Sequence, residues 1–299
     1  MVWPSKLVKL CCWVMGHYDR CVNSLSKARQ CRFGALRIVP MSKRIHAFDG
    51  INNFRDYGNY VTAAGRKVKS GQLFRSANLS QATDADLEAF AALGIAYVVD
   101  LRRPGERLRE PSRFPNGFIG QVIENDTGDQ VEAPHMEVLR ASGLNEEAVR
   151  AYMLNYYTHA PFEDRHIDLF TRYFQAVASG KGAVLIHCAA GKDRTGMLAA
   201  LTHHVLGVNR DDVMEDYLLT NVAARIEERV PTATEMVKGY FGGEPTPEAV
   251  KAFLGVEASY LERAFEMIED RYSSLDDYLV KALGVDDAMR DKVAHQLLA

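Results

Sequence analysis

A cysteine and an arginine lie six positions apart in the segment HCAAGKDRTG, which spans residues 187–196. The apolar run AVLI at 183–186 predicts a buried strand before this segment, and the pattern MLAAL at 197–201 predicts a helix after it. At such a strand–loop–helix connection, free backbone N–H groups and the positive end of the helix dipole face the same point. The segment therefore predicts a loop that binds a phosphate-like anion.

The side chains of this loop indicate chemistry as well as binding. Arg194 supplies a planar, permanently charged fork of donors that matches two phosphate oxygens. Cys188 lies at the base of the same positive field, which favours its thiolate form, and a thiolate that faces a bound phosphoryl group is placed for in-line attack. The backbone amides of residues 189–194 are expected to hold the equatorial oxygens. The expected substrate-binding residues are Ala189, Ala190, Gly191, Lys192 and Thr195.

Two other kinds of site do not fit this segment. A nucleotide-binding loop of the Walker type needs a glycine five positions before the Gly-Lys pair, where this chain has Ile186, and Asp193 stands where a Ser or Thr should bind magnesium. A zinc site needs clustered Cys and His at short fixed intervals, and no second pair lies near His187 and Cys188. We therefore expect neither a metal nor another cofactor.

The loop resembles the signature loop of the cysteine-dependent protein tyrosine phosphatase superfamily. Its Lys-Asp pair before the arginine is similar to that of bacterial tyrosine and dual-specificity phosphatases, which also accept phosphoinositides. Blocks at 53–58, 73–77, 98–102 with Glu106, and 272–279 resemble the same family, so the resemblance covers about residues 45–299. It implies a metal-independent phosphomonoester hydrolase that forms a cysteinyl-phosphate. The implied substrates are phosphorylated proteins, with phosphoinositides as a second class.

A general acid has to protonate the leaving oxygen, and two aspartates are candidates. The resemblance implies Asp193, a loop aspartate, in this role. Asp100 is the alternative because it ends a predicted parallel strand at 95–99, where catalytic groups of α/β proteins collect. Asp100 is equally well explained as a structural partner of Arg102 or Arg103.

Two further loop residues have open roles. Lys192 adds a second positive charge, which favours multiply charged substrates such as phosphoinositides, unless it is simply a solvated lysine. Thr195 either donates a hydrogen bond to the cysteine sulfur or satisfies the backbone at the start of the helix.

The rest of the chain predicts an α/β fold: a central, mostly parallel sheet flanked by helices, with a helical C-terminal part. Helices are expected after the N-cap Thr83, at 164–178 and 213–229, after Thr246-Pro247, and at 261–272 and 275–283. Two short amphipathic helices around Gly242-Gly243 make 225–260 a candidate mobile lid over the loop. Residues 41–299 are expected to form one catalytic domain.

The first 40 residues differ from the remainder. They hold both tryptophans and every cysteine except Cys188, in a spacing that matches no zinc pattern. We interpret 1–40 as a disordered tail or a spurious extension, with Met41 as the true start. One functional thiol in the remaining chain fits a reducing cytoplasm. The net charge of −3 does not indicate a nucleic-acid partner, and no apolar run reaches the length of a membrane span.

Two other reactions use a cysteine in an anion-binding loop. A sulfurtransferase or an arsenate reductase is the alternative function, although arsenate reduction needs resolving cysteines and only those of 1–40 are present. A non-catalytic phosphate-binding module would ordinarily lack the nucleophile that Cys188 supplies.

Overall fold

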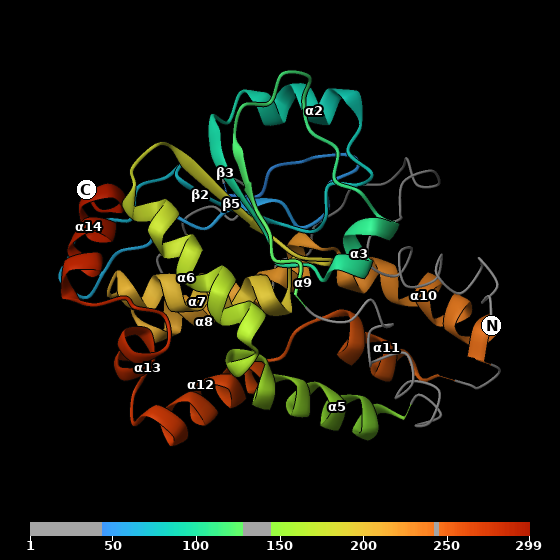
Figure 1. Cartoon of the computed structure of the whole chain (residues 1–299). Helices are drawn as coiled ribbons and strands as arrows, with labels where there is room; N and C mark the ends of the chain where they lie inside the picture. Colours follow the sequence, from blue (N-terminus) through green and yellow to red (C-terminus); the bar gives the residue numbers. More distant parts are fainter. Residues whose placement is uncertain (1–43, 128–144, 242–244) are drawn as a thin grey trace.

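The computed structural model describes residues 44–127, 145–241 and 245–299 (Figure 1). The interpretation of 1–40 as a tail therefore lies outside the described residues. A five-stranded sheet has the order β1-β2-β5-β3-β4, and only the β1–β2 pair is antiparallel. The strands are β1 (Arg55–Asp56), β2 (Leu73–Ser76), β3 (Ile95–Asp100), β4 (Gln121–Ile123) and β5 (Ala183–His187). The predicted α/β fold with a mostly parallel sheet is confirmed.

The sheet separates two hydrophobic cores, because successive side chains of a strand point to opposite faces. Val99 of β3 and Ile186 of β5 belong to the larger core, whereas Val98 and Leu185, one position earlier, belong to the smaller. Phe90 of α2 (Asp84–Ala91) covers the smaller core. The larger core lies under α6 (Asp164–Ala178) and α7 (Asp193–Val205), which contact the strands directly.

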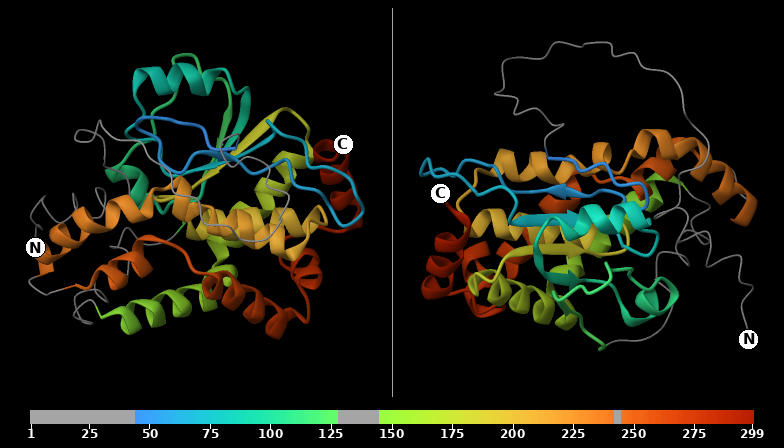
Figure 2. Two further views of the ribbon diagram at one scale, coloured as in Figure 1. Left: turned by 180° about the vertical axis from the view of Figure 1, so that it is seen from behind. Right: turned by 90° about the horizontal axis from the view of Figure 1, so that it is seen from above.

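Helix α3 (Pro104–Arg109) follows β3 and lies beside the carboxyl ends of the strands (Figure 1). The other helices enlarge the layer on the side away from α2, as the two views of Figure 2 show. They are α5 (Glu146–His159), α8 (Arg210–Leu218), α9 (Thr220–Ala223), α10 (Ile226–Phe241), α11 (Pro247–Leu254), α12 (Ala258–Tyr272), α13 (Leu275–Lys281) and α14 (Asp287–Leu297). A short 3-10 turn, η2 (Ala160–Phe162), joins α5 to α6. No helix in the described ranges is long and apolar enough to cross a membrane.

Local signals predicted several helices well. Thr83 caps α2 and forms a reciprocal capping box with Asp86, Thr246 caps α11 with Pro247 in its first turn, and α6 spans the predicted 164–178. The predicted single helix at 213–229 is wrong. The helix is interrupted after α9 at Arg225, which has a φ of 50°. Within α9, the side-chain amide of Asn221 bonds the backbone N–H and C=O of Val256, which ties this short helix to the segment after α11. Helix α5 has no counterpart in the sequence analysis.

Helices α10 and α11 correspond to the candidate lid. They pack against each other in a small core of their own, which includes Ile226 and Val230 from α10 and Val250 and Leu254 from α11. Helix α11 also contacts α5. Movement of this pair stays a prediction.

Candidate active site

The loop at 188–192 leaves the carboxyl end of β5, in the middle of the sheet, and leads directly into α7. Cys188 is buried, with 2% of its surface exposed. Within the described part of the chain, the amides of residues 189–195 donate no hydrogen bond, and the first intrahelical donor is Gly196, which bonds the carbonyl of Lys192 at 2.8 Å. Seven consecutive free N–H groups at a helix N-terminus form a site for an anion.

Groups outside the loop hold its carbonyls. The carbonyl of Ala189 accepts from the amide of Asn78 at 3.1 Å. The side-chain amide of Asn53 donates to the carbonyls of Ala190 and Gly191 at 3.0 and 2.9 Å, and Arg75 Nη2 donates to Gly191 at 3.1 Å. A peptide group is planar and trans, so its C=O and the N–H of the following residue point in opposite directions. Carbonyls that are held by groups outside the loop therefore leave the N–H groups pointing into the loop. The loop is therefore organised before any anion binds.

Behind the loop, Arg55 and Arg75 share one carboxylate, that of Asp216 on α8. Arg75 Nη1 donates to Asp216 Oδ2 at 2.7 Å, and Arg55 Nε lies 3.6 Å from Oδ1. All three side chains are at most 2% exposed. Burial would raise the pKa of Asp216, but the two guanidiniums outweigh burial and lower it. The sequence analysis assigned no role to Asp216.

Gly191 in the loop and Gly196 in the first turn of α7 have neighbours so close that a β-carbon would not fit. Gly191 has a φ of 67°, and a β-carbon there would collide with the carbonyl of Ser76. Gly196 lies against the ring of Tyr217, where a β-carbon would be 2.9 Å from two ring carbons. Both positions therefore exclude larger residues for steric reasons.

Arg194 is held in a fixed direction by Glu106 of α3. Its Nη1 and Nη2 donate to the two oxygens of Glu106 at 2.6 and 2.8 Å, and Nη1 also bonds the carbonyl of Leu101 at 3.1 Å. Burial would raise the pKa of Glu106, but Arg194 outweighs it and lowers this pKa far below its usual range. Such a two-point pair fixes the plane of the guanidinium. The sequence analysis noted Glu106 only as part of a family block.

Asp193, the first residue of α7, lies between two donors. Tyr157 of α5 donates its hydroxyl to Asp193 Oδ1 at 2.9 Å, and the ammonium of Lys192 lies 3.7 Å from Oδ2. Lys192 is 2% exposed, so the interpretation as a solvated lysine is wrong. Its ammonium bonds the carbonyls of Phe253 and Gly255 at the end of α11, and burial lowers its pKa.

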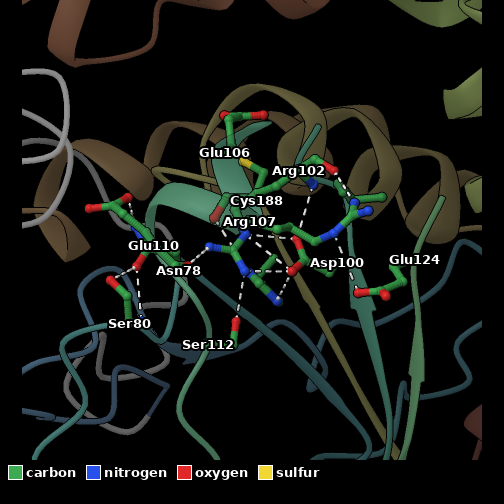
Figure 3. Close-up of polar contacts among 12 residues, drawn as sticks. Asn78, Ser80, Asp100, Arg102, Glu106, Arg107, Glu110, Ser112, Glu124 and Cys188 are labelled. Carbon is green, nitrogen blue, oxygen red and sulfur yellow. Dashed lines mark hydrogen bonds and ion pairs between the residues drawn. The ribbon is translucent and has the colours of Figure 1, made fainter. Parts of the chain in front are cut away.

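Asp100 is enclosed by Arg102, as Figure 3 shows. Arg102 Nη2 and Nε bond the two oxygens of Asp100 at 2.6 and 2.9 Å, and the Arg102 amide bonds Oδ1 at 3.0 Å. His187 Nε2 lies 3.5 Å from Oδ2. Burial would raise the pKa of Asp100, but His187 and Arg102 outweigh it and lower it. The carboxylate is therefore occupied by a structural ion pair.

A cavity of about 240 Å³ adjoins the loop. Lys192, Asp193 and Arg194 line it together with the aromatic side chains of Tyr152, Tyr156 and Phe253. Thr195 is fully buried, and its hydroxyl has no hydrogen-bond partner among the described residues, which leaves both of its predicted roles open. No group of three His, Cys, Asp or Glu suited to a metal ion occurs in the ranges that the structure describes.

Comparison with known proteins now places the chain. The model of the tyrosine phosphatase family matches residues 46–299. The chain belongs to this family. A Cupriavidus necator protein named as a tyrosine-protein phosphatase is 38% identical over 245 residues, 81% of this chain and 85% of that one. The triple specificity protein phosphatase PtpB of Mycobacterium tuberculosis is 32% identical over 285 residues, 85% of this chain and 99% of its own.

Among solved structures, that of P. aeruginosa TpbA covers 60% of this chain and 90% of its own at 21% identity. The TM-score between the two is 0.30. The family and the two relatives agree with the predicted activity: this chain is a phosphatase of the protein-tyrosine type. Every residue of the signature loop that the sequence analysis selected lies in the described part of the structure.

Proposed function

We propose that this phosphatase hydrolyses phosphotyrosine and phosphoserine or phosphothreonine esters through a cysteinyl-phosphate on Cys188, without a metal ion. The observation that carries the proposal is the row of seven free amides beside a buried thiol and a guanidinium fixed by Glu106. The amides and Arg194 bind the equatorial oxygens, whose charge shifts in the transition state. Cys188 attacks phosphorus, and water then hydrolyses the intermediate.

The cavity beside the loop supports an aromatic leaving group. Tyr152, Tyr156 and Phe253 offer ring surfaces against which a phenol ring can pack. The name of the Mycobacterium tuberculosis relative, a triple specificity phosphatase, supports a range of substrates that is wider than phosphotyrosine.

Asp193 is our candidate for the general acid. It lines the cavity, and among the described residues its Oδ2 accepts no hydrogen bond and has the ammonium of Lys192 3.7 Å away, whereas both oxygens of Asp100 are bonded to Arg102. Asp193→Asn should lower kcat/KM for phenyl phosphate by about 100-fold and remove the basic limb of its pH profile, with EDTA present throughout. Asp100→Asn should instead lower stability. A profile altered by Asp100→Asn alone would reverse the assignment, and dependence on added metal would refute the mechanism.

Lys192 supports phosphoinositides as additional substrates. Its ammonium lies in the cavity wall and can reach a second phosphate by exchanging one of its two carbonyl partners. Lys192→Met should therefore lower the rate on a phosphoinositide about tenfold relative to the rate on a phosphotyrosine peptide, the value of one charge-assisted hydrogen bond. The ratio of the two rates is the measurement. An unchanged ratio would show that Lys192 serves only the contact with α11.

The sulfurtransferase and arsenate reductase alternatives have less support. Cys188 is the only free cysteine among the described residues, so a resolving thiol for arsenate reduction is lacking in that part of the chain. We therefore retain phosphate ester hydrolysis as the proposal, and a reducing cytoplasm as the compartment that suits the one thiol of the described residues.

A further inference from the structure

A chain of two tyrosine hydroxyls ends on the loop aspartate. Tyr157 donates to Asp193 Oδ1 at 2.9 Å, and its oxygen lies 2.8 Å from the hydroxyl of Tyr217 on α8. Both tyrosines are at most 1% exposed. We propose that Tyr157, supported by Tyr217, is a positioning residue that orients Asp193 for proton transfer to the leaving group. The inference rests on the proposed role of Asp193 as the general acid.

The direction of the hydrogen bonds follows from counting protons. Asp193 Oδ1 accepts both when the carboxyl group is ionised and when its proton is on Oδ2, so the single proton of Tyr157 goes to Asp193. The bond between the two hydroxyls must then use the proton of Tyr217, which donates to the oxygen of Tyr157. Burial raises the pKa of Tyr157 well above 10, with the negative charge of Asp193 adding to the effect, so Tyr157 remains a donor throughout the working pH range.

The chain of bonds also distinguishes the two oxygens of Asp193. Oδ1 is bonded to Tyr157, while the one contact of Oδ2 within the described ranges is the ion pair with Lys192 at 3.7 Å. Because Asp193 lines the cavity, Oδ2 is the oxygen that remains for the proton of the leaving group. Holding Oδ1 sets the rotation of the carboxyl group and hence the direction in which Oδ2 points.

The surroundings of the two tyrosines fix their rings. The ring of Tyr157 stacks on Tyr260, with centroids 5.8 Å apart. Tyr217 packs on α7 at Gly196, where any β-carbon would push its ring away. The second glycine of the signature loop thus has a specific effect: it admits the ring that completes the hydrogen-bond chain to Asp193. Residues from α5, α7 and α8 meet at this point.

The test compares leaving groups in Tyr157→Phe. Phenol is a poor leaving group that needs its oxygen protonated, whereas dinitrophenol leaves readily without an acid. We expect kcat/KM of Tyr157→Phe to fall about tenfold for phenyl phosphate and less than about twofold for dinitrophenyl phosphate.

Two further variants make the result decisive. Tyr173→Phe is the matched control, because Tyr173 pairs with the hydroxyl of Tyr57 at the same 2.8 Å, and its other hydrogen-bond partner among the described residues is Thr202 near the end of α7. The values of kcat/KM for phenyl phosphate and dinitrophenyl phosphate should change by the same factor in this variant. The double variant Asp193→Asn/Tyr157→Phe should be no slower on phenyl phosphate than Asp193→Asn alone. Equal losses on both substrates in Tyr157→Phe, or additive losses in the double variant, would overturn the positioning role. If Asp193→Asn itself lowers kcat/KM by the same factor for both substrates, the assignment of Asp193 as the general acid is wrong as well.

Discussion

Replacing Cys188 with serine is expected to reduce turnover of para-nitrophenyl phosphate and of a phosphotyrosine peptide by about 10⁴-fold or more. A serine hydroxyl is not ionised near neutral pH, and among the described residues no carboxylate or imidazole is hydrogen-bonded to the side chain at position 188, so the variant lacks an activated nucleophile. The ring of His187, the neighbouring residue, contacts the backbone carbonyl of Cys188, and burial lowers the pKa of His187 to about 4, which makes it a weak base. Steady-state rates in EDTA measure the loss.

The same variant should retain its affinity for the anion. The free amides of 189–195 and the guanidinium of Arg194 do not depend on the sulfur. Inorganic phosphate should therefore bind Cys188→Ser about as well as it binds the wild type in calorimetry, and the thermal midpoint should change little. Substantial turnover by the serine variant would refute the covalent mechanism, whereas loss of phosphate binding would show that the substitution had damaged the loop.

Asp216→Asn is expected to destabilise the fold by about 3–5 kcal/mol, because it leaves two buried guanidiniums without a counter-charge. Arg55 and Arg75 are both fully buried, and burial together with the neighbouring Arg75 already lowers the pKa of Arg55 to about 9. Arg75 and Asn53 also hold the loop carbonyls, so phosphate affinity should fall with stability. Urea unfolding at pH 7 measures the first effect and calorimetry the second.

Asp276→Asn provides the matched control. Asp276 bonds Arg290 at 2.6 Å and His204 at 3.1 Å, but its side chain is 62% exposed, and an exposed pair contributes at most about 1 kcal/mol. If the free energy of unfolding falls by the same small amount in both variants, the buried cluster of Arg55, Arg75 and Asp216 contributes no more than a surface ion pair. Our account of how this cluster supports the loop would then be wrong.

The pH dependence of this difference has a defined sign. The pKa of Asp216 is lower in the folded chain than its ordinary value of 3.8, so its contribution is fully present above that value and is lost as pH falls through the folded pKa. The stability gap between the wild type and Asp216→Asn should therefore be constant from about pH 5 to 8 and shrink in acid.

The signature loop was predictable because its information is local. Cys188, Gly191 and Arg194 lie within seven positions, and the apolar run before them and the helical pattern after them fix the backbone through which they act. The caps of α2 and α11 are local for the same reason: a side chain at the N-cap bonds an amide three residues away.

The partners of these residues were not predictable, because they come from distant parts of the chain. Glu106 lies 88 positions from Arg194, and Asp216 lies 141 positions from Arg75. The hydroxyl of Tyr157 reaches Asp193 from α5, a helix that the sequence analysis did not identify. A single sequence offers no signal for such pairs, since an acidic residue or a tyrosine has the same local pattern wherever its partner lies.

The sequence by itself determined that this chain has a cysteine and an arginine in a strand–loop–helix segment, since the side chains and the backbone pattern both reside in ten consecutive residues. Only the tertiary structure decided which residues from other elements orient the side chains of this segment. Packing α3, α5 and α8 around the loop sets the plane of Arg194, supports the loop through Asp216 and leaves Asp193 facing the cavity. Such directions depend on contacts across the fold, which form when the apolar faces of the helices are buried.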